Sequence, residues 1–142
     1  MEVNLFQLFN EIQKEFLKHC YKSVEKYNIK MSDMVCLLFL HNNHPLDTAR
    51  DIVHHQKLSP AMVSKSIDEL KSYGYIETIR DENDSRYVHL IITEKAQDLI
   101  RDLDKASDIF VEILTRDISD EKIKLMTEVA LKMESNLSLK NR

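Results

Sequence analysis

The sequence predicts a mainly α-helical protein with one small β hairpin. Apolar residues recur at steps of three and four in residues 1–30 and 93–142, which is the period of an amphipathic helix. The period changes to two only around residues 76–92, as expected of strands. One glycine and two prolines leave few positions for tight turns. A hydrophobic share of 43% in 142 residues is enough for the core of a single domain.

The N-terminal region is expected to form a long helix from about Asn4 to Tyr27. Its apolar stripe is wide enough for two partners, which we take to be its own domain and a second subunit. The stripe consists of Leu5, Leu8, Phe9, Ile12, Phe16, Cys20 and Val24, widened by Phe6, Leu17 and Tyr21. A second helix is expected behind a cap at Ser32, and its uniformly apolar residues 34–40 predict burial on most sides. Pro45 prevents its continuation.

Two shorter helices joined by a tight connection are predicted next. Thr48 and Asp51 have the spacing of a capping box, in which each side chain accepts a hydrogen bond from the other residue's backbone amide. Ser59 is a favourable N-cap, and Pro60 occupies the first helical position, where a missing N–H costs nothing. Because only residues 56–58 separate them, the two helices are expected to form a helix-turn-helix.

A hairpin is predicted directly behind the second of these helices. Gly74, the only glycine, stands where a left-handed residue ends a helix without strain. Val88, Leu90 and Ile92 then alternate with other side chains, and the polar run 81–86 separates two short strands. Helix, tight turn, strand, protruding loop and strand are together typical of a winged helix.

The wing residues resemble those of a known family. The run Asp84-Ser85-Arg86, the strand behind it and the run Thr93-Glu94-Lys95-Ala96 resemble the wing signature of the MarR family of transcriptional regulators. That signature has Asp-x-Arg, a strand, then Leu-Thr and a glycine; here Ile92 replaces the leucine and Ala96 replaces the glycine. The resemblance extends to the order of helices along the chain. It implies a winged helix-turn-helix with long N- and C-terminal dimerisation helices.

Two further helices are expected at the C-terminal end, the fifth from a cap at Thr93 to about Arg116 and the sixth behind a cap at Ser119. We expect one MarR-like unit over residues 1–142. Within it, residues 31–92 would form the DNA-binding region, and residues 1–30 and 93–142 the helical dimerisation region. The long helices carry more apolar surface than a winged helix can cover. A two-fold homodimer is therefore favoured over a monomer in which they pack only on one another.

The candidate DNA-binding residues lie on the second helix of the helix-turn-helix and on the wing. They are Ser59, Pro60, Ala61, Ser64, Lys65, Asp84 and Arg86. A helix N-terminus can hold a phosphate, and Lys65 and Ala61 are suited to contacts with base edges in the major groove. The resemblance places Arg86 in the minor groove, oriented by Asp84 through a charge-assisted hydrogen bond. The alternative is a solvated helix face and a surface ion pair that contributes little.

The charge balance argues against DNA binding. Residues 47–93 contain six Lys and Arg against eight Asp and Glu, a net charge of −2, and the whole chain carries −4. Neutralisation of phosphates supplies much of the affinity for DNA, so a basic surface is expected of a DNA-binding protein. We therefore expect modest affinity with strong salt sensitivity. His54, His55 and His89 are candidates for additional positive charge near phosphates.

No enzyme, cofactor or metal function is expected. The sequence has no nucleophile elbow, no glycine-rich phosphate loop and no H-E-x-x-H motif. A buried structural cysteine is favoured over a redox role for Cys20, and Cys36 lies within an apolar run. A zinc site is a minor alternative to solvent-exposed histidines, because the sequence offers only partial ligand sets: His41 with His44, and His54 with His55.

We therefore predict a cytoplasmic, homodimeric, sequence-specific DNA-binding transcriptional regulator. Cytoplasmic localisation is inferred from the lack of an export signal, a long apolar segment and a C-x-x-C motif. The resemblance implies a repressor on a palindromic operator that responds to a small aromatic or phenolic effector. Phe16, Tyr21 and Tyr27 are candidates for lining the effector pocket, although core packing is commoner for such residues. The alternative function is a winged-helix protein–protein interaction module with weak or no DNA binding. The net negative charge of residues 47–93, which we call the reading head, favours this alternative.

Overall fold

The computed structural model describes residues 4–140 of the chain. The chain divides into two compact units, Met1–Asp108 and Ile109–Arg142. Within the described residues, the first unit holds helices α1 to α4, a two-stranded antiparallel sheet and most of α5, and the second holds the end of α5 and α6. The predicted mainly α fold with a small β wing is therefore confirmed. No helix in the described part of the chain is long and apolar enough to span a membrane.

Helix α1 spans Leu5–Val24 and continues into a short 3-10 helix, η1, at Glu25–Tyr27, close to the predicted bounds. Asn4 caps it by accepting the backbone N–H of Gln7 at 3.1 Å. The two halves of the apolar stripe differ. Cys20 and Val24 are fully buried, whereas Phe6 at the other end is 81% exposed. The C-terminal half of α1 thus packs within the first unit, and its N-terminal half presents apolar side chains on the surface.

Helix α2, Met31–Asn42, is the centre of the core. All seven residues 34–40 are buried, as the sequence predicts. The prediction that Ser32 caps this helix is wrong. The cap is Lys30, whose N–H is accepted by Oδ2 of Asp33 at 3.0 Å, so the helix begins one residue before Ser32. The Ser32 hydroxyl instead accepts a hydrogen bond from Ser66 of α4 at 3.0 Å and joins the two helices.

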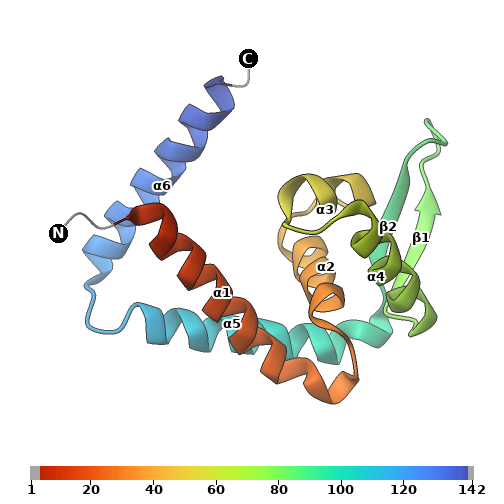
Figure 1. Ribbon diagram of the computed structural model, residues 1–142, viewed down its shortest axis with the longest axis horizontal. Coiled ribbons are helices and arrows are strands. Elements are labelled where there is room, and N and C mark those ends of the chain that lie inside the picture. Colours follow the sequence, from red (N-terminus) through yellow and green to blue (C-terminus); the bar gives the residue numbers. More distant parts are fainter. Residues whose placement is uncertain (1–3, 141–142) are drawn as a thin grey trace. The chain divides into compact units, whose positions relative to one another are not determined.

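The helix-turn-helix consists of α3, Ala49–His55, and α4, Pro60–Ser72 (Figure 1). The capping box is present, since the hydroxyl of Thr48 accepts the N–H of Asp51 at 3.2 Å and the carboxylate of Asp51 accepts the N–H of Thr48 at 3.0 Å. Ser59 caps α4 by accepting the N–H of Met62 at 3.2 Å. Both predicted caps are confirmed, so local sequence signals fix where each of these helices begins.

Helix α4 ends at the predicted glycine. Gly74 has a φ of +75°, the left-handed conformation that glycine adopts without strain. Its N–H donates to the carbonyl of Lys71, and the N–H of Tyr75 donates to the carbonyl of Leu70, both at 2.9 Å. This pair of hydrogen bonds is the Schellman motif, which satisfies carbonyls at the helix end and turns the chain into the first strand.

The wing is the hairpin of β1, Ile76–Arg80, and β2, Val88–Ile92, which pair antiparallel from Ile76 opposite Ile92 to Arg80 opposite Val88. Its loop protrudes beyond the helices in Figure 1. Ile76 and Leu90 are buried and attach the hairpin to the core. The backbone of Leu90 also donates to the carbonyl of Asp47 at 2.8 Å, which joins the wing to the segment before α3.

Thr93 occupies the N-cap position, as predicted, but its side chain makes no capping hydrogen bond. The chain first forms a 3-10 helix, η2, at Glu94–Ala96, and α5 spans Gln97–Leu114. The Thr93 hydroxyl donates to the carbonyl of Gly74, and its backbone N–H donates to the carbonyl of Tyr75 at 2.9 Å. The hydroxyl and the N–H of Thr93 therefore bind the turn after α4, while its carbonyl accepts the N–H of Ala96 at the start of η2. Within the first unit, α5 buries Leu99, Ile100, Leu103 and Ala106.

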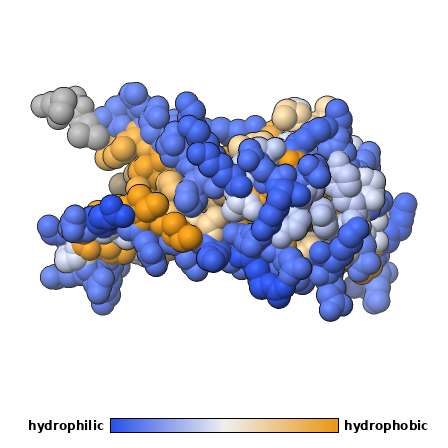
Figure 2. Space-filling view, turned by 90° about the horizontal axis from the view of Figure 1, so that it is seen from below, coloured by the Kyte–Doolittle hydropathy of each residue, from blue (hydrophilic) through white to orange (hydrophobic). Residues whose placement is uncertain are grey.

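The second unit consists of the end of α5 and α6, Asp120–Lys140. Ser119 caps α6 as predicted, because its hydroxyl accepts the N–H of Lys122 at 3.4 Å. None of the residues in α6 is buried, although several are large and apolar. Figure 2 shows apolar side chains gathered at the surface on an otherwise largely hydrophilic face. The exposed apolar residues of this unit include Ile113, Leu125, Met126, Val129, Met133 and Leu137.

Candidate nucleic-acid interface

Helix α4 presents the predicted reading surface to solvent. Val63, Ser66 and Leu70 are buried and fix the helix against the core. Ser64 and Lys65 are exposed, as are Ser59, Pro60 and Ala61 at the start of the helix. The burial pattern therefore leaves five of the predicted contact residues accessible on one helix, and the buried side holds that helix in a fixed orientation.

The other two predicted residues form an ion pair on the wing. The Arg86 side chain donates from Nε to Oδ1 of Asp84 at 3.0 Å and from an amino nitrogen to Oδ2 at 2.7 Å. The backbone N–H of Arg86 also donates to Oδ1 of Asp84 at 3.1 Å. The guanidinium lowers the pKa of the Asp84 carboxyl. The Arg86 side chain is 86% exposed, so this bidentate pair orients a cation at the surface without burying it.

A second ionic contact fixes the loop end of the wing to the segment before α3. The ring of His89, on β2, binds Asp47 through Nδ1 at 2.7 Å and Asp81 through Nε2 at 2.8 Å. The two carboxylates raise the pKa of His89. Asp81 in addition accepts the backbone N–H groups of Asn83 and Asp84, which shapes the wing loop. The positive charge of His89 is therefore directed to two carboxylates, and not to a phosphate as the sequence suggested.

Most acidic residues of the reading head have partners inside the protein. Glu69 binds Lys30 at 2.6 Å, Asp51 binds the capping threonine, and three more are engaged by Arg86 and His89. Arg50 and Lys71, by contrast, have no acidic partner among the residues that the structure describes, and Lys65 forms no ion pair there although its charge helps to lower the pKa of Glu69. The net charge of the head thus understates the cationic groups that are available to a ligand.

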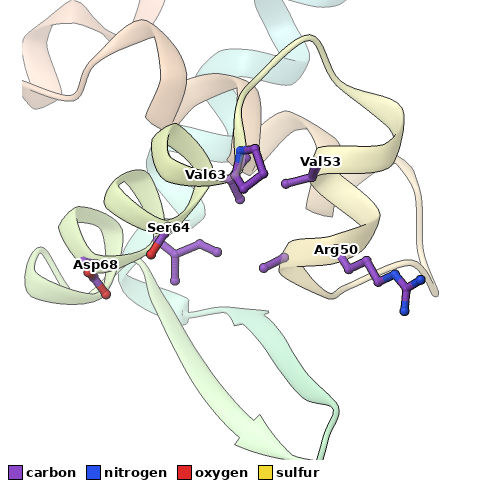
Figure 3. A pocket seen from close by; sticks show the side chains of 8 residues that line it. Arg50, Val53, Val63, Ser64 and Asp68 are labelled. Carbon is purple, nitrogen blue, oxygen red and sulfur yellow. The ribbon is translucent and has the colours of Figure 1, made fainter.

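Two hollows flank the first turn of α3. An apolar one of about 370 Å³ lies between α3 and α4, where Val53 and Val63 face each other while Arg50 extends away from it (Figure 3). A second, of about 410 Å³, lies between the first turn of α3 and the wing, and it is lined by Thr48, Ala49, Arg50, Arg86, Tyr87 and Val88. Arg50 lines both. Arg50 is not among the predicted contact residues, because those come from the second helix of the helix-turn-helix and from the wing.

The cysteines and histidines have structural surroundings. Burial raises the pKa of the Cys20 thiol, which lies 3.7 Å from the Ser107 hydroxyl, and raises that of Cys36 to about 12. Both thiols are thus shifted away from the reactive thiolate form. His41 binds Asp104 at 2.8 Å. Within residues 4–140, no group of three or more His, Cys, Asp or Glu side chains is arranged to hold a metal ion.

A comparison with known proteins identifies the family. The profile of the transcriptional regulator SarA/Rot family matches residues 18–103, more than half of the chain. The chain belongs to the SarA/Rot family of transcriptional regulators. The match covers the last seven residues of α1, all of α2, the helix-turn-helix, the wing and the first turns of α5, so it includes the elements that position the candidate interface.

Curated relatives of this SarA/Rot-family chain are regulators, not enzymes. The HTH-type transcriptional regulator BilQ of Clostridioides difficile (strain CD3) is 24% identical over 121 residues, which are 85% of this chain and 81% of BilQ. The HTH-type transcriptional regulator SarT of Staphylococcus aureus (strain MSSA476) is 33% identical over 54 residues, 38% of this chain and 46% of SarT. The chain is thus a transcriptional regulator of the winged-helix type.

Solved structures show the same fold. The transcriptional regulator PA3341 has a TM-score of 0.81 at 20% identity, over 97% of this chain and 99% of that one. MarR has a TM-score of 0.74 at 17% identity, over 96% and 98% of the two chains. The resemblance to the MarR family that the wing residues indicate is therefore confirmed at the level of the fold.

Proposed function

We propose that the chain is a sequence-specific DNA-binding regulator that acts as a ligand-responsive repressor on a palindromic operator, as a homodimer. The observation that carries this proposal is the joint exposure of Ser64 and Lys65 on a core-anchored helix and of Arg86 on the wing. A helix in the major groove and an arginine in the adjacent minor groove would read DNA from one rigid head. MepR of S. aureus, which has a related fold (TM-score 0.57, 20% identity), has been solved bound to an oligodeoxyribonucleotide.

The homodimer is supported by uncovered apolar surface. In the second unit Met126, Val129, Met133 and Leu137 recur along one side of α6 and are each 47–65% exposed. An isolated helix with such a stripe is unstable in water unless a partner covers it. A two-fold axis through this region would pair two reading heads, and paired heads bind two half-sites about one helical turn apart. Residues 1–30 and 93–142 remain our proposed dimerisation region.

The proposed effector site lies between α1 and the reading head. A cavity of about 250 Å³ there is lined by residues of α1, by Val35 and by the connection between α3 and α4. Lys57 of that connection donates to the Asn10 side chain at 3.0 Å and links the head to α1. A ligand that binds more tightly to one arrangement of α1 and the reading head would favour that arrangement in both subunits. The distance between the two reading heads of the proposed dimer would then change. Phe16 lines a neighbouring cavity of about 150 Å³, whereas the hydroxyls of Tyr21 and Tyr27 are bound to Ile29 and Asp102.

The second candidate function is a protein-interaction module, which the net charge of −2 in residues 47–93 favours. Selection of bound duplexes from a random pool distinguishes the DNA-binding regulator from the protein-interaction module. Recovery of a two-fold symmetric sequence would support a homodimeric DNA reader, and an asymmetric motif would contradict the palindromic operator. Failure to enrich any duplex at low salt would favour the protein-interaction module. Release of the selected duplex by small phenols or aromatic carboxylates, measured by mobility shift, tests the effector.

A further inference from the structure

The hollow between α3 and the wing brings together two arginines that are far apart in the sequence. Arg50 comes from the first turn of α3, and Arg86 comes from the end of the wing loop. Thr48 and Tyr87 are also among the residues that line this hollow. Arg86 is paired with Asp84, so Arg50 supplies the unpaired positive charge at this hollow, in a region whose net charge is −2.

The two arginines differ in their availability. Arg86 uses Nε and one amino nitrogen to bind Asp84, which leaves the other amino group of its guanidinium for a ligand. Arg50 is exposed and has no hydrogen bond or ion pair within the described residues, so all five of its N–H donors are free. Thr48 and Asp51 close the capping box around the same turn and hold the α3 backbone beneath Arg50. An unpaired guanidinium on a fixed backbone is suited to bind a phosphate.

We propose that this hollow receives one backbone phosphate of duplex DNA, bound by Arg50 with Arg86 on the opposite wall. The proposal rests on the DNA-reading function proposed above and adds a contact that sets the register of the head. When α4 lies in a major groove and the wing in the adjacent minor groove, the strand between the grooves passes between these two elements. Arg50 lines both the hollow beside α4 and the hollow beside the wing, so it lies on that path.

The first test is a salt series with full-length protein and a duplex recovered from the random pool. Loss of one phosphate contact reduces the slope of log affinity against log salt by about 0.9, or about 1.8 for a two-headed dimer. We expect Arg50→Ala to lower the slope by this amount and to weaken a selected and a scrambled duplex by a similar factor, since phosphate contacts carry no base information. Lys22→Ala, which removes one exposed charge from α1, is the matched control and should leave the slope unchanged.

The second test removes the phosphate's charge. Duplexes carrying a single neutral methylphosphonate at successive positions are compared for wild type and Arg50→Ala. At one position the methylphosphonate should weaken DNA binding by wild type about tenfold. It should have little effect on DNA binding by Arg50→Ala, because the variant lacks the arginine that binds this phosphate. Circular dichroism verifies that Arg50→Ala, an exposed helical position, remains folded.

The outcomes separate the phosphate contact from the proposed function. Two outcomes would overturn the phosphate contact and leave DNA reading intact. In the first, wild type binds DNA and Arg50→Ala has the same slope of log affinity against log salt. In the second, each methylphosphonate weakens the binding of both proteins equally. A wild type that binds no duplex would overturn both proposals. Competition by inorganic phosphate at constant ionic strength distinguishes the two sources of this chemistry. If inorganic phosphate binds in the hollow but Arg50→Ala does not change the affinity for DNA, the hollow is an anion site unrelated to DNA, and the proposal is overturned.

Discussion

The guanidinium of Arg86 is bound edge-on to the carboxylate of Asp84, two residues before it, with N–O distances of 3.0 and 2.7 Å. The pair leaves 86% of the Arg86 side chain exposed, so its effect on folding stability is small. Its consequence is geometric, because a side chain with many rotamers is held in one direction before any ligand arrives. Preorganisation of this kind lowers the entropy lost on binding.

Replacement of Arg86 by alanine is therefore expected to weaken duplex binding without affecting the fold. The loss should be roughly five- to a hundredfold and greatest for duplexes with A·T-rich flanks, whose narrow minor grooves attract a guanidinium. Mobility shift with flanks of different composition measures it, and thermal unfolding serves as the control for folding. Equal weakening on A·T-rich and G·C-rich flanks would show that Arg86 does not enter the minor groove.

The contact of His89 with Asp47 and Asp81 predicts a pH-dependent wing. The carboxylates raise the pKa of His89 above its usual 6.5, so its stabilising contribution is complete below about pH 6.5 and is lost as the pH rises through the folded-state pKa. We expect the protection of wing amides against hydrogen exchange to fall over that interval. In His89→Gln, the protection of the wing amides should be low at both the acidic and the basic end of this pH interval, with no decrease between them. Asp81, whose pKa is lowered by the hydrogen bond with His89, contributes stability that is lost only as the pH falls toward its folded-state pKa, so it adds no step in this interval.

The buried carboxyl of Asp33 predicts a second pH effect. Its Oδ1 has no hydrogen-bond partner within the described residues, and burial raises its pKa, followed by the repulsion from Glu69. Ionisation is thus unfavourable in the folded state, and stability declines as the pH rises through the raised pKa. Asp33→Asn keeps an acceptor for Lys30 and removes the charge, so it should raise the unfolding free energy at pH 8 by about 1 kcal/mol. Denaturant unfolding at pH 5 and pH 8 measures it, and a larger gain at pH 5 would contradict the argument.

Gly74 is expected to tolerate no other L-residue without cost. Its φ of +75° would strain any side chain, and a Cβ would also lie 3.3 Å from Cδ of Lys95. Because the Lys95 side chain can move, backbone strain dominates, and Gly74→Ala should destabilise the protein by about 1–2 kcal/mol. Chemical denaturation gives this value. Lys71→Ala, an exposed position in the last turn of the same helix, is the control and should change stability by less than about 0.5 kcal/mol.

The apolar stripe on α6 predicts the effect of a charge on dimerisation. Met133→Asp places a carboxylate within the stripe and should convert the proposed dimer to monomer at micromolar concentration, as measured by sedimentation equilibrium. Leu131 is 59% exposed, compared with 48% for Met133, but points to another side of the helix. Leu131→Asp should therefore remain dimeric. Dissociation of both variants to the same extent would show that the stripe is not the interface.

Local sequence signals predicted the helix-turn-helix and the wing because short-range physics determines these elements. Thr48, Ser59 and Gly74 each act on their own or the adjacent turn, so their effect can be read from spacing alone. Ser32, whose predicted cap is wrong, and Thr93, which holds the N-cap position without a side-chain cap, are residues of the same cap-forming types. Their hydroxyls bind Ser66 and Gly74, partners distant in sequence that only the tertiary structure brings near.

By itself, the sequence determined the order of elements, the caps at Thr48, Ser59 and Ser119, and the exposed face of α4, since helical periodicity decides which side chains can reach a core. Only the tertiary structure showed that four of the eight acidic residues in 47–93 are bound by Lys30, Arg86 and His89, and that Arg50 and Arg86 line the same hollow. Charge counts treat all ionic groups as equally available to a partner. Which of them remain available depends on distances across the fold, because electrostatic contacts act through space and not along the chain.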